Sequence, residues 1–303
     1  MTLSPSDREG GPPGALRAFE CRYLRALRGW HLACPWIRAE PPLHPSRRPR
    51  HRNHPRPPRG ARPGRAGRYL IVNADDLGAD NGTTRGIIEA HERGIVTSAS
   101  LMVDMPGARA AARMAREHPR LGVGLHVNFT AGPRALDPGD LRAQQRELER
   151  QLDVFGDLTG ALPTHIDSHH HVHRRADVAS LFVELARDRG IPLRGFGGIT
   201  YVGNFYGQWE HGTTDLRHIS PDYLIALLRS IAPGFSELAC HPGDRDARFD
   251  PVYDWQRQVE LESLTNPRVT AAAAQEGIRL VDYREYRRLA PAAGASLPRY
   301  STT

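Results

Sequence analysis

Short apolar runs alternate with helical patterns about seven times between Arg68 and Tyr286, and this alternation restricts the fold more than any other feature. The runs at residues 69–72 and 122–127, for example, have the length and the apolar content of buried strands. A strand followed by a helix and then another strand implies parallel pairing with right-handed crossovers. The sequence therefore predicts an α/β protein, either a parallel barrel or an open α/β sheet.

The predicted elements follow one another with short connections, apart from one long segment. We expect strands at residues 69–72, 98–103, 122–127, 164–169, 192–194, 236–240 and 278–281. We expect helices at residues 83–93, 108–118, 138–159, 178–189, 220–232, 255–264 and 267–275. Residues 195–219 hold six glycines and several aromatic residues without a clear period, so they predict a long irregular loop of the kind that often carries function.

Four of the predicted strands end in residues that can take part in chemistry. These residues are the pair Asp75 and Asp76, then His126, His169 and His241. In a parallel barrel the carboxyl ends of all strands open on one face, where the active site lies. We therefore expect these side chains to converge in space, although they are far apart in the sequence.

Residues 165–173 contain five histidines in nine positions. Alternation in an extended chain would put one set of side chains on one face and His170 on the other. This set is His165, Asp167, His169, His171 and His173. Imidazole is the commonest protein ligand for transition metals, and a carboxylate beside it can orient the ring. A solvated polar loop and an expression tag are the alternatives, and the interior, interrupted position of the run argues against a tag.

One carboxylate and two imidazoles on separate strand ends would leave open positions on a divalent ion, which is typical of a catalytic metal site. Each residue also has a simpler interpretation. Asp75 and Asp76 could cap the next helix, although a cap needs only one of them. A lone histidine such as His126 is often merely hydrogen-bonded, and His241 lies in a Cys-His-Pro-Gly sequence that could be a turn.

Residues 1–67 differ from the rest of the chain in composition. They contain 12 of the 25 prolines, together with 14 arginines and four acidic residues; this net charge of +10 leaves −3 of the total +7 for the remainder. Such a segment cannot bury enough apolar surface to offset the entropy of ordering, so we expect a disordered extension. A basic arm that binds nucleic acid or anionic lipid is the alternative. Without aromatic interleaving or a folded basic face, we expect a dispensable extension and no nucleic-acid partner.

The cysteines and the hydropathy pattern indicate the cellular compartment in which the protein is expected. Cys21, Cys34 and Cys240 form neither a disulfide framework nor a CxxC site, which fits a reducing environment. No run of 18 apolar residues is present, and arginines interrupt the N-terminal segment. We therefore expect a cytoplasmic protein without a membrane span or a secretory signal.

Four motifs resemble those of the YdjC-like carbohydrate deacetylases, a family that includes chitooligosaccharide (chitin disaccharide) deacetylases and a hopanoid-biosynthesis branch. They are Asn-Ala-Asp-Asp-Leu-Gly at 73–78, Gly-Leu-His-Val-Asn at 124–128, Thr-His-Ile-Asp-Ser-His-His-His-Val-His at 164–173 and Cys-His-Pro-Gly at 240–243. The resemblance implies a distorted (β/α) TIM-like barrel of about seven parallel strands, formed by residues 68–290 as a single domain, with a loose tail at 291–303.

The resemblance also implies an activity and a set of residue roles. The activity is the metal-dependent removal of acetyl groups from N-acetylated amino sugars, by attack of a metal-activated water on the acetamide. The implied metal ligands are Asp76, His126 and His169, the base is Asp75, and the acid is His241. The implied ion is Mg²⁺, with Zn²⁺ as the alternative because mixed nitrogen and oxygen ligands suit it. The implied partners are a small or oligosaccharide amino-sugar substrate and a second copy of the chain in a homodimer.

One departure and several alternatives bear on the substrate. The segment 130–140 is shorter than is usual in the family, so we expect that a lid over the sugar pocket is absent. Arg194 resembles a family position near the site, and His171 and His173 could support the ligands or contact the substrate. Another barrel metallohydrolase, such as a phosphoesterase or an amidohydrolase, is one alternative; many of these begin with His-x-His where this chain has Asp75 and Asp76. Further alternatives are a hopanoid-linked deacetylase acting on a lipid-linked amino sugar and a non-enzymatic metal- or nucleic-acid-binding protein.

Overall fold

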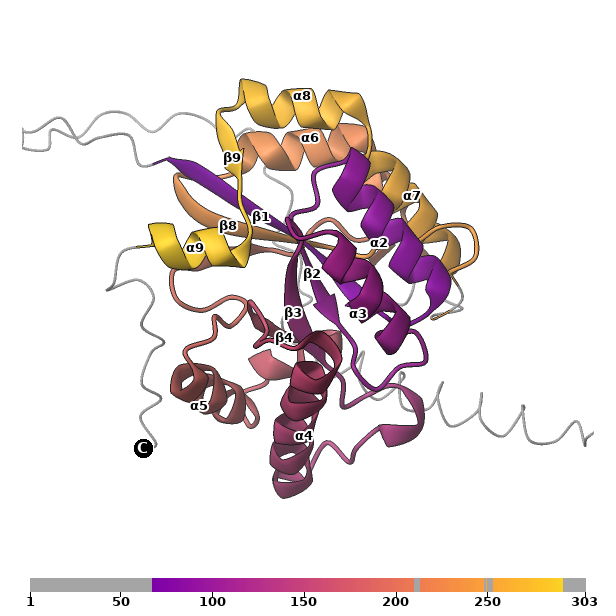
Figure 1. Ribbon diagram of the computed structural model, residues 1–303. Helices are drawn as coiled ribbons and strands as arrows, with labels where there is room; N and C mark the ends of the chain where they lie inside the picture. Colours follow the sequence, from indigo (N-terminus) through magenta and orange to yellow (C-terminus); the bar gives the residue numbers. More distant parts are fainter. Residues whose placement is uncertain (1–66, 210–212, 248, 250–252, 291–303) are drawn as a thin grey trace, which may run out of the picture. The chain divides into compact units, whose positions relative to one another are not determined.

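The computed structural model describes residues 67–209, 213–247, 249 and 253–290 (Figure 1). The expected disordered extension, apart from Gly67, and the expected loose tail at 291–303 lie outside the described residues. The folded domain expected at 68–290 contains almost all of the described part. None of the described helices combines the length and the hydropathy that crossing a membrane would require.

A curled parallel sheet forms a half-barrel at the centre of this part of the chain (Figure 1). Its strands are β1 (Arg68–Leu77), β2 (Ser98–Leu101), β3 (Gly122–Val127), β4 (Ile166–Ser168), β5 (Ile199–Val202), β8 (Gly234–Cys240) and β9 (Ile278–Leu280). The order is β4-β3-β2-β1-β8-β5, and β9 joins the first residues of β1. Every pairing is parallel, so the expected α/β fold with a distorted, TIM-like barrel of parallel strands is confirmed.

Helices connect the strands and cover the outside of the sheet (Figure 1). They are α2 (Asn81–Arg93), α3 (Ala108–Glu117), α4 (Leu141–Thr159), α5 (Ala179–Arg189), α6 (Pro221–Ser230), α7 (Asp254–Leu264), α8 (Pro267–Gln275) and α9 (Tyr283–Leu289). Helix α4 begins at Leu141 instead of Pro138 because the side chain of Asp140 accepts the hydrogen bond of the Ala143 amide and caps the helix. The sequence analysis missed α9, which is capped in the same way by Asp282.

The two faces of the sheet carry different side chains. On β1, Leu70, Val72 and Ala74 belong to the large apolar cluster that includes residues of the covering helices. The alternate residues Asn73 and Asp75 are fully buried and polar. Because side chains alternate along a strand, the interior of the half-barrel receives the polar set. Buried polar groups need partners, and these are supplied by the network of charged residues at the strand ends.

Two expectations about loops and strands were wrong. The segment 195–219, expected to be irregular, contains β5, which pairs with β8, and a short two-stranded sheet of β6 (Gln208–Trp209) and β7 (Thr213–Thr214). The strand expected at 192–194 is reduced to one bridge between Ile166 and Leu193. Frequent glycines hid the short strand, because glycine contributes no side chain to the alternating pattern.

Candidate metal centre and catalytic residues

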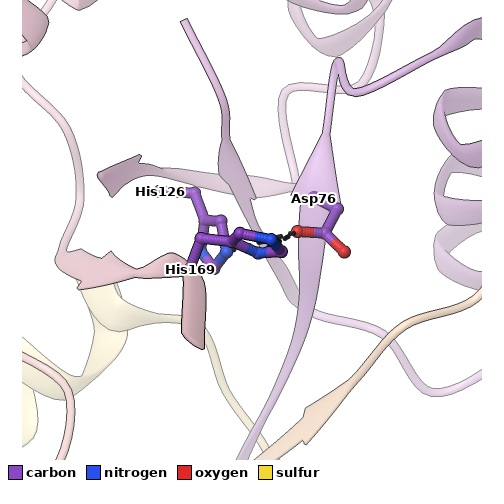
Figure 2. Close-up of side chains that lie close together, drawn as sticks. All are labelled: Asp76, His126 and His169. Atoms are coloured by element: carbon purple, nitrogen blue, oxygen red, sulfur yellow. Dashed lines mark ion pairs between the residues drawn. The ribbon is translucent and has the colours of Figure 1, made fainter. Parts of the chain in front are cut away.

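Asp76, His126 and His169 meet at the carboxyl ends of three parallel segments (Figure 2). Asp76 lies near the end of β1, His126 lies on β3, and His169 begins the 3₁₀ helix η2 (His169–Arg174) directly after β4. Asp76 Oδ1 is 3.3 Å from His126 Nε2 and 3.2 Å from His169 Nδ1. The structure therefore brings together the three predicted metal ligands.

The backbone is unusual at this cluster. Asp76, His170 and His171 have φ angles of 69°, 55° and 52°, and no other non-glycine residue in the described ranges has a positive φ. A non-glycine residue in this region costs about 1–3 kcal/mol, and such strain is concentrated at functional sites. The positive φ of Asp76 turns the chain where the pairing of β1 with β2 becomes irregular. The side chains of the adjacent residues Asp75 and Asp76 therefore contact different partners.

The turn at His170 and His171 also overturns the expected alternation of residues 165–173. Instead of sharing a face, the side chains diverge after Ser168, where η2 begins. His165 stacks on Tyr283, and His170 is exposed and stacks on His169. His171 Nε2 lies 3.0 Å from the hydroxyl of Tyr201, and His173 Nδ1 lies 2.7 Å from the hydroxyl of Ser168. Of these five histidines, His169 alone belongs to the three-residue cluster.

His126 is held in an orientation that suits metal binding. Its Nδ1 lies 2.7 Å from Asp167 Oδ1, and its Nε2 is on the side of Asp76. When Nδ1 donates its proton to Asp167, the lone pair of Nε2 is available to bind an ion next to Asp76. Burial lowers the pKa of His126, but Asp167, Asp76 and Asp75 outweigh it and raise that pKa to about 10. The negative charge around Nε2 therefore favours a positive charge at this point, which is a proton when no ion is bound.

Asp76 provides the test of whether a metal ion fits. Its Oδ1 is buried and accepts no hydrogen bond from the described residues, although two imidazole nitrogens lie within 3.3 Å. Burying a carboxylate oxygen that forms ion pairs but accepts no hydrogen bond is costly in a folded protein. A divalent cation bound by one carboxylate oxygen and two imidazoles would satisfy it, so the residues present fit the expected ion.

Arg194 forms the charged centre of the half-barrel next to this cluster. Its guanidinium is fully buried and donates two hydrogen bonds to Asp75, of 2.6 and 2.7 Å. It also pairs with Asp167 Oδ2 at 2.7 Å and Glu237 Oε1 at 2.8 Å. Burial raises the pKa of Asp75, but Arg194 outweighs this effect and holds that pKa well below its ordinary value. Asp75 is therefore an anion at any pH near neutrality.

Asp75, His126 and Asp167 also lie close enough together to form a three-ligand set. The guanidinium of Arg194 already supplies the positive charge between the two carboxylates. A second ion there would be repelled by this cation, so the set supports the first cluster and does not form a second centre.

His241 follows the last residue of β8 and faces Asp75. Its Nε2 lies 3.9 Å from Asp75 Oδ2, and its backbone amide donates a 2.5 Å hydrogen bond to Glu260. Burial lowers the pKa of His241 to about 4, assisted by Arg257 and opposed by Asp75. The ring is therefore neutral near pH 7.

The sequence analysis missed two site residues that come from α7. Arg257 Nη2 pairs with Asp76 Oδ2 at 2.7 Å, and Glu260 accepts hydrogen bonds from both the His241 amide and the Tyr253 hydroxyl. Both residues are buried, with exposed fractions of 2% and 0%. The one signal in the sequence for such site residues is a charged residue on the core-facing side of a predicted helix. The sequence does not say which strand end that residue reaches.

The parallel half-barrel thus carries at its strand ends an Asp-His-His cluster that could hold a metal ion. The family model for YdjC-like protein matches residues 69–275, and the chain belongs to the YdjC-like family. A carbohydrate deacetylase of Geobacillus stearothermophilus is 36% identical over 253 residues, which cover 73% of this chain and 99% of that protein. A chitooligosaccharide deacetylase of Serratia marcescens is 32% identical over 258 residues, covering 72% and 99%.

A solved structure is also similar to this chain in fold and sequence. It comes from Enterococcus faecalis V583, is named for cellobiose-phosphate cleavage, and is 27% identical to this chain with a TM-score of 0.59. The match covers 72% of this chain and 98% of that one. The family and the hydrolase class expected from the four motifs are therefore confirmed.

Proposed function

We propose that the protein is a metal-dependent deacetylase that removes acetyl groups from N-acetylated amino sugars, of the chitooligosaccharide type or a related glycoconjugate. The observation that carries this proposal is the buried Oδ1 of Asp76, which faces two imidazole nitrogens at 3.3 and 3.2 Å beside the anionic Asp75. The named relatives support the choice of a sugar acetamide as substrate. Asp76, His126 and His169 would hold the ion, with Mg²⁺ as the first candidate and Zn²⁺ as the second.

When bound, the ion supplies a Lewis acid that polarises the acetamide carbonyl and makes a nearby water more acidic. Asp75 acts as the base that takes a proton from the attacking water, because Arg194 keeps it ionised and fixes its orientation. A carboxylate whose pKa is lowered, as that of Asp75 is, is a weak base. The attacking water therefore has to be acidic before it can transfer its proton to Asp75. The role of Asp75 as base therefore depends on the cluster next to it.

His241 delivers a proton to the departing amine. Because its pKa is about 4, the ring is neutral before the reaction and has to acquire the proton during it. The 3.9 Å separation between its Nε2 and Asp75 Oδ2 is longer than a hydrogen bond, so a small movement or one water molecule has to complete the path. The proton removed by Asp75 can then return to the amine through His241.

Acetate release tests the proposed function. We expect the purified protein to release acetate from N-acetylglucosamine oligomers, to lose this activity after chelation and dialysis, and to regain it when Mg²⁺ or Zn²⁺ is restored. An oligomer panel of increasing length would report which substrate is preferred. A chelated protein that keeps its full activity would contradict the metal dependence, and a protein inactive on every sugar acetamide would contradict the substrate class.

His241→Ala separates proton donation from a structural role. An acid helps most when the leaving group is a poor one, so this change should lower the rate on a sugar acetamide by about 10²-fold or more and affect an activated acetyl ester much less. Bound metal should remain, because His241 is outside the ligand set. His218→Ala, which alters a partly exposed histidine that pairs with Asp215 and lies outside the metal-ligand cluster, is a suitable control. Equal losses on amide and ester would argue that His241 only holds the turn.

A further inference from the structure

Arg257 contacts the carboxylate of Asp76 from helix α7. Its Nη2 lies 2.7 Å from Asp76 Oδ2, its Nη1 lies 3.5 Å from the carbonyl oxygen of His241, and the residue is 2% exposed. A buried guanidinium needs a counter-charge, so this pairing is not an optional surface contact. The backbone of Arg257 also accepts a hydrogen bond from the Gly243 amide, which ties α7 to the turn after His241.

The two oxygens of the Asp76 carboxylate therefore have different surroundings. Oδ2 accepts a hydrogen bond from the guanidinium, whereas Oδ1 faces the nitrogens of His126 and His169 at 3.3 and 3.2 Å. A free carboxylate can bind an ion through both oxygens. With Oδ2 occupied, one oxygen remains, and the cluster offers three donor atoms, two nitrogens and one oxygen.

We propose that Arg257 is a positioning residue that keeps Asp76 a one-oxygen ligand and so preserves open positions on the ion for water and substrate. The inference rests on the proposed metal site. A second oxygen from Asp76 would occupy one of those positions, and open positions are what a hydrolytic metal needs.

The positive charge of Arg257 gives the proposal a measurable signature. A guanidinium bound to a ligand carboxylate repels a nearby cation and lowers the affinity of the site. Removing it should therefore strengthen metal binding, since one repulsive charge is lost and one donor oxygen is gained. Simple damage to the site would have the opposite effect and weaken metal binding.

Titration with Co²⁺ measures both consequences without any assay of deacetylation. In Arg257→Met we expect Co²⁺ to bind about tenfold tighter or more, and the visible absorption bands to weaken as the coordination number rises. Arg257→Lys keeps the charge and a donor, so its affinity should stay within about threefold of the wild type. Arg268→Met, which removes an exposed arginine paired with Asp222, should change neither property.

Direct observation of the ligand geometry covers the case in which Arg257→Met does not fold. In a crystal structure of the wild-type protein loaded with Zn²⁺, Oδ1 alone of the Asp76 carboxylate should lie within about 2.2 Å of the ion. Two oxygens at that distance would overturn the proposal, as would equal or weaker Co²⁺ binding with an unchanged spectrum in a folded Arg257→Met. A wild-type protein that binds neither ion would instead contradict the metal site of the proposed function.

Discussion

Asp75→Asn should lower the rate of deacetylation by about 10²–10⁴-fold while leaving the bound metal in place. The amide has nearly the same shape as the carboxylate but cannot accept the proton of the attacking water. The metal should remain because the proposed ligand is Asp76, which faces His126 and His169, and not Asp75. Metal content after dialysis and kcat/KM on a sugar acetamide, measured on the same preparation, check both parts.

A matched control shows whether the loss is specific to the base. Asp80→Asn makes the same substitution on the same segment, at the residue whose side chain caps α2, and asparagine caps a helix as well as aspartate. It should keep both activity and metal. Asp75→Asn also removes the anion that pairs with Arg194, so the thermal transition of each variant has to be compared. A folded Asp75→Asn protein with wild-type activity would exclude Asp75 as the base.

The pH profile offers an independent check on the same residue. A carboxyl group loses its function as a base when it is protonated, and Arg194 holds the pKa of Asp75 well below the ordinary value. In kcat/KM, protonation of Asp75 should therefore cause no decline even at about pH 4, where an ordinary aspartate with a pKa of about 3.9 would be roughly half protonated. When Arg194 is replaced by lysine, which cannot form the same two parallel hydrogen bonds, the acidic limb due to Asp75 in the pH profile of kcat/KM should move to higher pH.

The convergence of the strand ends could be predicted from the sequence, because the carboxyl ends of parallel strands meet on one face. This rule placed Asp76, His126 and His169 together without any knowledge of the connecting helices, and the structure agrees. The divergence of residues 165–173 could not be predicted. It depends on left-handed conformations at His170 and His171, and histidine gives no signal that it will adopt them.

The contributions of α7 were beyond the sequence for a different reason. Arg257 and Glu260 lie more than one hundred residues from Asp75 and Asp76, on a helix whose pattern shows only that one side is buried. Which strand end that side meets is decided by how the helix packs across the sheet. The family resemblance places Arg194 near the site. Its three ion pairs, with Asp75, Asp167 and Glu237, could not be predicted because they form only when the half-barrel closes around it.

Removal of a metal ligand should have the largest effect of any single change on this protein. His126→Ala, His169→Ala and Asp76→Ala each delete one of the three proposed ligands, and we expect each to lose most of the bound divalent ion and nearly all activity. His118→Ala, a histidine paired with Glu92 outside the cluster, should retain both.

Asp167→Asn tests the residue that orients a proposed ligand, because Asp167 contacts His126 without belonging to the ligand set. Loss of such an orienting group typically lowers metal affinity by about 10–100-fold, less than loss of the ligand itself. Metal analysis of the dialysed proteins distinguishes these levels, and stoichiometric metal in a folded His169→Ala would exclude His169 from the centre.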